Sequence, residues 1–181
     1  MTLIYPELAA FMQGGVSIMV ASRGIQNIPS AVRALGCRVL PGQASGQPSG
    51  QAPGQAPGRD RIRVLVPVPQ CRALLQDIRA TGRVAVVFSK PTTHQALQFK
   101  AEDALVAALE EADLAAVEAY RIAMSAEIQL VGFPPESAQA LLSCAPADLA
   151  PIVFTPEAGF VQTPGPDAGA PMPGRPEGTR P

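Results

Sequence analysis

The sequence predicts a mainly β protein, a β-barrel with flanking helices, and three observations lead to this fold class. About six runs have the apolar patterning of strands, whereas the helical segments are few and mostly short. Helices do not follow every strand, as they would in a doubly wound α/β fold. The 181 residues, of which 47% are hydrophobic and 16% charged, supply enough apolar material for one core.

The strands are predicted from alternating or continuous apolar runs. Residues 15–22 alternate small or polar side chains with large apolar ones and end at the turn signal Arg23-Gly24. In the run 83–88 every residue after Arg83 is apolar, which is typical of a strand buried on both faces. The predicted strands lie within 15–22, 30–40, 61–68, 83–88, 95–106 and 148–161.

Four helices are predicted between these strands, at 6–13, 70–81, 110–130 and 135–143. The second has the clearest pattern, because Leu74, Leu75 and Ile78 share one helical face. Gly82 follows it at a favourable position for a C-cap.

Two segments have the composition of disordered chain. Residues 42–58 repeat Gly-Gln with Pro, Ser and Ala between, and contain no charge and no large apolar side chain. Residues 164–181 are similarly rich in Pro and Gly. We therefore predict one domain over 1–163, with 42–58 as a disordered insert in a loop between two strands, followed by a disordered tail over 164–181.

Composition and charge exclude several classes of function. A formal net charge of −1 argues against a nucleic-acid partner. Cys37, Cys71 and Cys144 include no close pair and His94 is the single histidine, so we expect reduced thiols and no metal. The N-terminus lacks the pattern of a secretory signal and no apolar run is long enough to span a membrane. We expect a cytoplasmic protein with a small-molecule partner.

No general catalytic motif is present, and no residue is assigned as catalytic. The sequence contains no GxSxG, P-loop or GxGxxG motif, and one histidine limits triad chemistry. His94 itself is predicted to be an exposed turn residue rather than a base. Candidate binding residues are instead cations, hydroxyls and amides near strand ends, namely Arg33, Arg38, Gln70, Arg72, Ser89, Thr92, Thr93 and Gln95.

Each candidate has an alternative interpretation. Arg72 opens a predicted helix, where backbone N–H groups favour an anion, but an exposed helix charge is more often an ordinary solvated side chain. Arg33 and Arg38 lie either on opposite faces of one strand or on one face if the strand bulges. The hydroxyl-rich segment from Ser89 to Gln95 suits ring-edge hydrogen bonds, and it also suits a hairpin turn.

The order of these motifs resembles the pyridoxamine 5'-phosphate oxidase-like flavoproteins, which have the FMN-binding split-barrel fold. The resemblance depends on Gly15-Val-Ser-Ile-Met-Val-Ala-Ser22, the Arg33/Arg38 run, residues 61–68 with Gln70-Cys-Arg-Ala-Leu-Leu, and residues 82–100. It extends to Phe154-Thr-Pro-Glu and Gln162-Thr-Pro-Gly-Pro166. It covers most of residues 5–166, with the insert as an interruption.

This resemblance implies a homodimer with FMN in grooves at the subunit interface. Arg33 and Arg38 have the spacing of the family's Arg-x-x-x-x-Lys segment, with Arg in place of Lys. Gln70-Cys71-Arg72 replaces the family's Ser-Arg-Lys, so the last cation alone is retained. The family's flavin-contacting Gln falls near Gln95 or Ala96. The substrate-binding residues of the true oxidase are not recognisable in this sequence.

The implied activity is FMN-dependent hydride exchange with a small molecule. A flavin carries out the redox chemistry, so the missing catalytic motif is consistent with this activity. Two alternatives stay open at this stage. One is a binding or sensing protein that keeps the barrel but holds haem, another cofactor or none. The other is a degenerate structural protein.

We expect that replacing residues 42–58 by a short turn leaves folding and any FMN binding intact, because loop closure entropy changes slowly with loop length. Thermal unfolding and cofactor titration of the shortened chain would measure both properties. Loss of either would make the insert part of the binding site.

Overall fold

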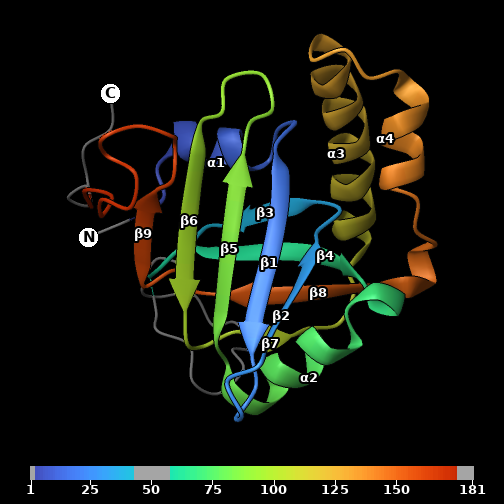
Figure 1. Ribbon diagram of the computed structural model, residues 1–181. Coiled ribbons are helices and arrows are strands. Elements are labelled where there is room, and N and C mark those ends of the chain that lie inside the picture. Colours follow the sequence, from blue (N-terminus) through green and yellow to red (C-terminus); the bar gives the residue numbers. More distant parts are fainter. Residues whose placement is uncertain (1–2, 43–57, 175–181) are drawn as a thin grey trace.

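Alternating and continuous apolar runs assemble into two antiparallel sheets, seen in a computed structural model that describes residues 3–42 and 58–174 (Figure 1). The first sheet contains β1 (Ser17–Arg23), β2 (Pro29–Arg33), β5 (Val84–Ser89), β6 (Ala96–Ala101) and β9 (Ala158–Val161), in the order β2-β1-β5-β6-β9. The second contains β3 (Cys37–Leu40), β4 (Arg61–Pro67), β7 (Leu105–Val106) and β8 (Leu149–Phe154), in the order β3-β4-β8-β7. The predicted mainly β fold with flanking helices is confirmed.

The four predicted helices are present as α1 (Pro6–Met12), α2 (Arg72–Thr81), α3 (Glu111–Leu130) and α4 (Pro135–Leu141). Short 3-10 turns occur at Val68–Gln70 and Pro146–Asp148. α2 buries Leu74, Leu75 and Ile78 as expected, and Gly82 ends it with a φ of 65°, a conformation that favours glycine. α3 and α4 pack side by side near the β1–β2 side of the five-stranded sheet (Figure 1).

The predicted single strand over 30–40 is wrong, because the chain changes sheets within it. Backbone hydrogen bonds follow the change: Ala34 N–H donates to Ile18 O of β1 at 2.9 Å, whereas Leu35 N–H donates to Leu65 O of β4 at 2.7 Å. Ala34, Leu35 and Gly36 are all buried. The corner therefore looks like strand in the sequence, although β2 and β3 belong to different sheets.

Two other predicted strands are also divided, and one burial prediction is wrong. The runs 95–106 and 148–161 each supply one strand to each sheet, as β6 with β7 and β8 with β9. β5 alternates between buried and half-buried positions instead of being buried on both faces. Burial on both faces belongs to β4 and β8, which pair at the centre of the four-stranded sheet.

One buried cluster joins the two sheets. The inward positions of β5 and β6 supply Phe88 and Phe99, whose rings meet edge to face with centroids 6.1 Å apart. Ile62 and Ile152 from the four-stranded sheet belong to the same cluster and are fully buried. The outward side chains of β1 and β5 are thus left on the molecular surface, where a ligand can reach them.

The low-complexity predictions fall partly outside the described residues. Residues 43–57 of the insert and 175–181 of the tail are not described, so the predicted disorder of those segments is not tested. Residues 164–174 differ from the expected disordered tail because they fold back on β9: Gly169 N–H donates to Val161 O at 2.7 Å, and Met172 N–H to Gly159 O at 2.8 Å.

α3 approaches the sheets closely because small residues face it. A Cβ added at Gly15 would lie 2.5 Å from the carbonyl oxygen of Ala123 and 3.1 Å from Cβ of Glu127. The neighbouring Gly14 is different. A Cβ added there would lie 3.4 Å from the carbonyl oxygen of Ala10 and 3.5 Å from that of Phe11, which are ordinary contact distances. Gly15 therefore determines how near α3 lies to the start of β1.

Gly15→Ala should lower the free energy of unfolding by about 1–3 kcal/mol, because the added methyl group overlaps the α3 backbone. Gly14→Ala is the matched control and should cost less. Chemical denaturation of the two variants measures the difference. Equal stability of the two variants would show that α3 is not held at this distance.

Candidate functional site

The structure separates the two arginines that the sequence placed on one strand. Arg33 ends β2 in the five-stranded sheet, whereas Arg38 lies on β3 in the four-stranded sheet. Neither predicted arrangement, opposite faces or a bulge, is correct. The two cations consequently have different surroundings.

Arg33 lies on the outer face of the five-stranded sheet and is half-buried. Its Nη1 donates to the Ser17 hydroxyl at 2.7 Å. Ser17 is in turn the cross-strand partner of Ser89, one of the predicted binding residues. Within residues 3–42 and 58–174 no carboxylate pairs with Arg33. The guanidinium group is thus oriented but not neutralised.

Tyr120 of α3 lies close to Arg33 and is 1% exposed. Its hydroxyl has no hydrogen-bond partner among the described residues. Burial raises the pKa of Tyr120 to about 12, although the charge of Arg33 and its polar contact with the phenol act in the opposite direction. The phenol is thus buried beside an unneutralised guanidinium, without a hydrogen bond of standard geometry.

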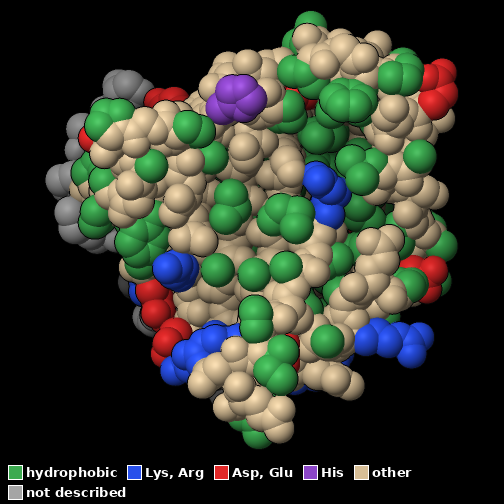
Figure 2. Space-filling model, viewed as in Figure 1, with side chains coloured by type: hydrophobic (Ala, Val, Ile, Leu, Met, Phe, Trp, Pro, Cys, Tyr) green, Lys and Arg blue, Asp and Glu red, His purple; other side chains and the backbone are tan. Residues whose placement is uncertain are grey.

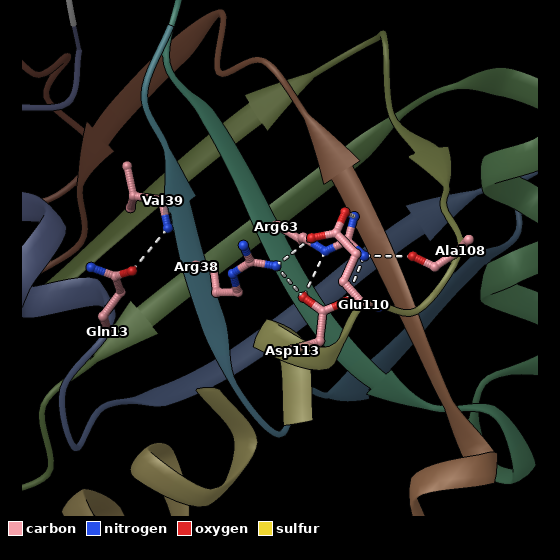
Figure 3. Close-up of polar contacts among 7 residues, drawn as sticks. All are labelled: Gln13, Arg38, Val39, Arg63, Ala108, Glu110 and Asp113. Atoms are coloured by element: carbon pink, nitrogen blue, oxygen red, sulfur yellow. Dashed lines mark hydrogen bonds and ion pairs between the residues drawn. The ribbon is translucent and has the colours of Figure 1, made fainter. Parts of the chain in front are cut away.

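Arg38 is paired with two carboxylates through one of its nitrogens, as Figure 3 shows. Its Nη1 donates to Asp113 Oδ1 at 2.7 Å and to Glu110 Oε2 at 2.8 Å. Arg63 of β4, the direct cross-strand partner of Arg38, binds the same Asp113 through Nε at 2.8 Å and Nη2 at 2.5 Å. Arg38 therefore belongs to an ion-pair network on the other sheet from Arg33.

Asp113 is the centre of this network. It is 0% exposed and Arg63 is 3% exposed, so each charge needs the other. Burial alone would raise the pKa of Asp113, but hydrogen bonds from Arg63 and Arg38 and from the backbone N–H of Glu110 hold it below its usual value. Asp113 is ionised at neutral pH and fixes the start of α3 to β3 and β4.

The hairpin between β5 and β6 carries the other predicted residues. Lys90 N–H donates to Gln95 O at 2.8 Å and His94 N–H to Lys90 O at 2.9 Å, which closes a turn. The hairpin-turn interpretation is therefore confirmed for this segment. Thr93, His94 and Gln95 are exposed, and His94 has a φ of 58°. The exposed position predicted for His94 is confirmed.

Glu127 of α3 attaches this hairpin to the helix. Its carboxylate accepts hydrogen bonds from the Thr92 hydroxyl and, at 3.1 Å, from the Thr92 N–H, and lies 3.6 Å from Lys90 Nζ. Burial opposes ionisation, but these contacts hold the pKa of Glu127 below its usual value. Thr92 is thus bonded within the protein, whereas Ser89 is half-buried on the outer face.

Gln70 and Arg72, the other two predicted residues, make no side-chain bond to these groups in the part of the chain that the structure describes. Gln70 ends a 3-10 turn and Arg72 begins α2, and both are exposed. No hydrogen bond or ion pair joins either side chain to the other predicted residues in the described ranges. The solvated interpretation of Arg72 agrees with this exposure.

A shallow hollow of about 420 Å³ lies further along the outer face of the five-stranded sheet. Ala31, Ala21, Ala85 and Ala158 occur at one level across the sheet, with Lys100 between the last two. Figure 2 shows small hydrophobic side chains across this face, with Lys and Arg side chains around it. The face is flat and apolar enough to contact a planar ring or a second protein surface.

Sequence reasoning missed six residues that the structure brings to these sites, namely Ser17, Arg63, Glu110, Asp113, Tyr120 and Glu127. One signal was available: Asp113 in the first turn of an expected helix favours the helix N-terminus. The described residues contain no group of three or more His, Cys, Asp or Glu that could hold a metal, and no helix among them is long and apolar enough to cross a membrane.

No protein-family model and no curated protein matches this chain significantly. Three solved structures illustrate what it is similar to. A pyridoxamine 5'-phosphate oxidase-related, FMN binding protein from Nostoc punctiforme is 11% identical with a TM-score of 0.43; the match covers 91% of this chain and 88% of that one. A protein of the pyridoxinephosphate oxidase family from Clostridium acetobutylicum, related to a general stress protein, is 11% identical with a TM-score of 0.37. That match covers 80% of this chain and 78% of the other.

The third is HutZ, the heme storage protein from Vibrio cholerae, at 17% identity and a TM-score of 0.42, with 89% of this chain and 95% of that chain covered. The names therefore include both FMN-binding and haem-storing proteins. The resemblance to pyridoxamine 5'-phosphate oxidase-like proteins, predicted from the sequence, agrees with the names of the first two structures.

Asp113→Asn should lower the free energy of unfolding by about 3 kcal/mol, because it leaves two arginines with one exposed carboxylate. Since folding lowers the pKa of Asp113, its stabilisation is complete above the unfolded pKa of about 3.9 and is lost as pH falls through the folded value. The stability difference between wild type and variant should therefore shrink below about pH 4.

Denaturant unfolding at several pH values measures this difference. Glu111→Gln is the control, because Glu111 is an exposed acid in the same helical turn and makes no such contact. A pH-independent difference for Asp113→Asn would contradict the assigned ionisation.

Proposed function

We propose that this chain binds FMN on the outer face of the five-stranded sheet and acts as an oxidoreductase that exchanges a hydride between the flavin and a small molecule. One observation carries the proposal: Arg33 is half-buried on this face, is oriented by Ser17 and has no carboxylate partner in the described part of the chain. A phosphate group supplies the missing anion through charge-assisted hydrogen bonds.

The rest of the face suits the remaining parts of the cofactor. Bound flavin supplies the redox chemistry, so the chain needs only to hold the phosphate, bond the ring edge and leave one ring face open. Ser89 lies level with Ser17, and Met19 and Val87 form the adjacent pair on the same face. Thr93 and Gln95 are exposed donors on the neighbouring hairpin.

Two further residues have defined roles in the proposal. Arg72 remains a second cation for the phosphate, together with Gln70, because both are exposed at the start of α2. Arg38 is not assigned to this cofactor site, since it lies on the other sheet and its guanidinium is bonded to Glu110 and Asp113. Thr92 holds the hairpin in place through Glu127 instead of contacting the ring.

We also propose a homodimer in the cytoplasm. The alanines that cross the outer face at one level let a second sheet or helix approach closely, so a second copy would enclose a ligand held at Arg33. Cys37, Cys71 and Cys144 are free thiols, which fits a reducing compartment. The mass of the particle in solution tests the dimer.

The alternative function is a non-catalytic binding or sensing protein that holds haem or another cofactor. The unneutralised Arg33 could equally hold a haem propionate, because a propionate is also an anion. The absorption spectrum of the purified protein separates the two functions. A flavin band, with FMN identified by mass after denaturation, supports the oxidoreductase. A haem spectrum supports the alternative, and colourless protein that takes up no FMN removes the flavin proposal.

Arg33→Ala should weaken FMN binding by about 10- to 100-fold, the value of a hydrogen bond to a charged group. Riboflavin lacks the phosphate, so its affinity should change little. Arg79→Ala is the control, since Arg79 is an exposed cation on α2. Fluorescence titration of wild type and both variants with the two flavins measures the six affinities. An equal loss for FMN and riboflavin would show that Arg33 does not hold the phosphate.

A further inference from the structure

Arg38 and Arg63 are direct cross-strand partners in the four-stranded sheet. Two like charges in this position repel one another, so the pair requires an anion between them. The start of α3 supplies two carboxylates, Glu110 and Asp113. The two carboxylates are not equivalent.

Asp113 is a permanent member of the network. It is fully buried and accepts four hydrogen bonds, two from Arg63, one from Arg38 and one from the N–H of Glu110. These donors saturate the carboxylate and also fix the backbone of α3. Exchange of Asp113 would leave a buried Arg63 without its counter-ion.

Glu110 is held differently. Its side chain is 55% exposed, and it meets Arg38 Nη1 at 2.8 Å and Arg63 Nη1 at 3.5 Å. Both Nη1 atoms thus converge on one exposed carboxylate, and Arg38 itself is 22% exposed (Figure 3). Glu110 is also the N-cap of α3, and its side chain takes part in the capping box with Asp113. Because Asp113 keeps its own bonds to both arginines, a rotation of the Glu110 side chain would remove only one of the two carboxylates from the guanidinium groups.

We propose that Arg38 and Arg63 form an oxyanion-binding site that Glu110 occupies, and that a phosphate group competes with Glu110 for it. With Glu110 turned away, two guanidinium groups face one carboxylate, and the excess positive charge lies at the solvent-exposed side. Phosphate has the charge and the paired oxygens that two guanidinium groups bind. The site is separate from Arg33, which lies on the other sheet, so it does not depend on the proposed cofactor.

The test is inorganic phosphate binding to wild type and to Glu110→Gln, measured by thermal unfolding. Glutamine keeps an oxygen near the helix start but removes the competing charge. Phosphate should bind Glu110→Gln at least about tenfold more tightly than wild type, and at about ten times its Kd should raise the Tm by roughly 3–5 °C. Chloride at equal ionic strength corrects for screening.

Glu118→Gln is the matched control, because Glu118 is an exposed acid on α3 whose nearest cation is Arg121 at 3.7 Å. Phosphate bound at Arg33 would stabilise all three proteins alike. The proposal is overturned if Glu110→Gln responds to phosphate no more than wild type, or if its response persists when Arg38→Ala is added. If Glu110→Gln does not fold, Glu110→Ser places a favoured N-cap at the same position and makes the same comparison.

Discussion

The structure depends on one buried carboxylate, that of Asp113, between two arginines on adjacent strands. Without it, Arg63 would be a buried cation opposite a second cation, and neither β3 nor β4 could keep its register without a large desolvation cost. Asp113 removes that conflict and at the same time fixes the first turn of α3. One interaction therefore determines both the pairing in the four-stranded sheet and the position of the longest helix.

The position of α3 in turn determines the surroundings of the outer face. Its first turn is fixed to the four-stranded sheet by Asp113, and Glu127, fourteen residues later, is bonded to the hairpin of the five-stranded sheet. Gly15 allows the helix to approach between these two points. Tyr120 lies halfway along and is thereby carried to Arg33. The helix thus joins the two sheets and brings a phenol to the unneutralised cation.

Local patterns in the sequence were sufficient for most elements but not for the change of sheet. Gly82 and the buried face of α2 follow from residues a few positions apart, so they could be predicted. Ala34, Leu35 and Gly36 form the corner between β2 and β3. They are buried, and they continue the apolar run of the flanking strands. Nothing local distinguishes a strand that continues from one that enters a second sheet, because the difference lies in which partner receives the backbone hydrogen bonds.

The same reasoning applies to the candidate site. Arg33 could be selected from the sequence because cations near strand ends are unusual in an apolar run. The partner of Arg38 could not, since Asp113 lies 75 positions further along the chain. Nothing in the sequence around Arg63 distinguishes it from other strand residues. Its part in the ion-pair network follows only from its pairing opposite Arg38.

The formal charge of the whole chain is therefore a poor guide to anion binding by this protein. A net charge of −1 argues against a broad basic surface of the kind that binds nucleic acid. Binding of a single phosphate depends instead on whether a guanidinium group has no carboxylate, or has one that phosphate can displace. Arg38 and Arg63 have Asp113 and Glu110, whereas Arg33 has the neutral hydroxyl of Ser17. The change of sheet after Arg33 separates it from the acids of α3, and this separation leaves it able to bind an external anion without displacing a carboxylate.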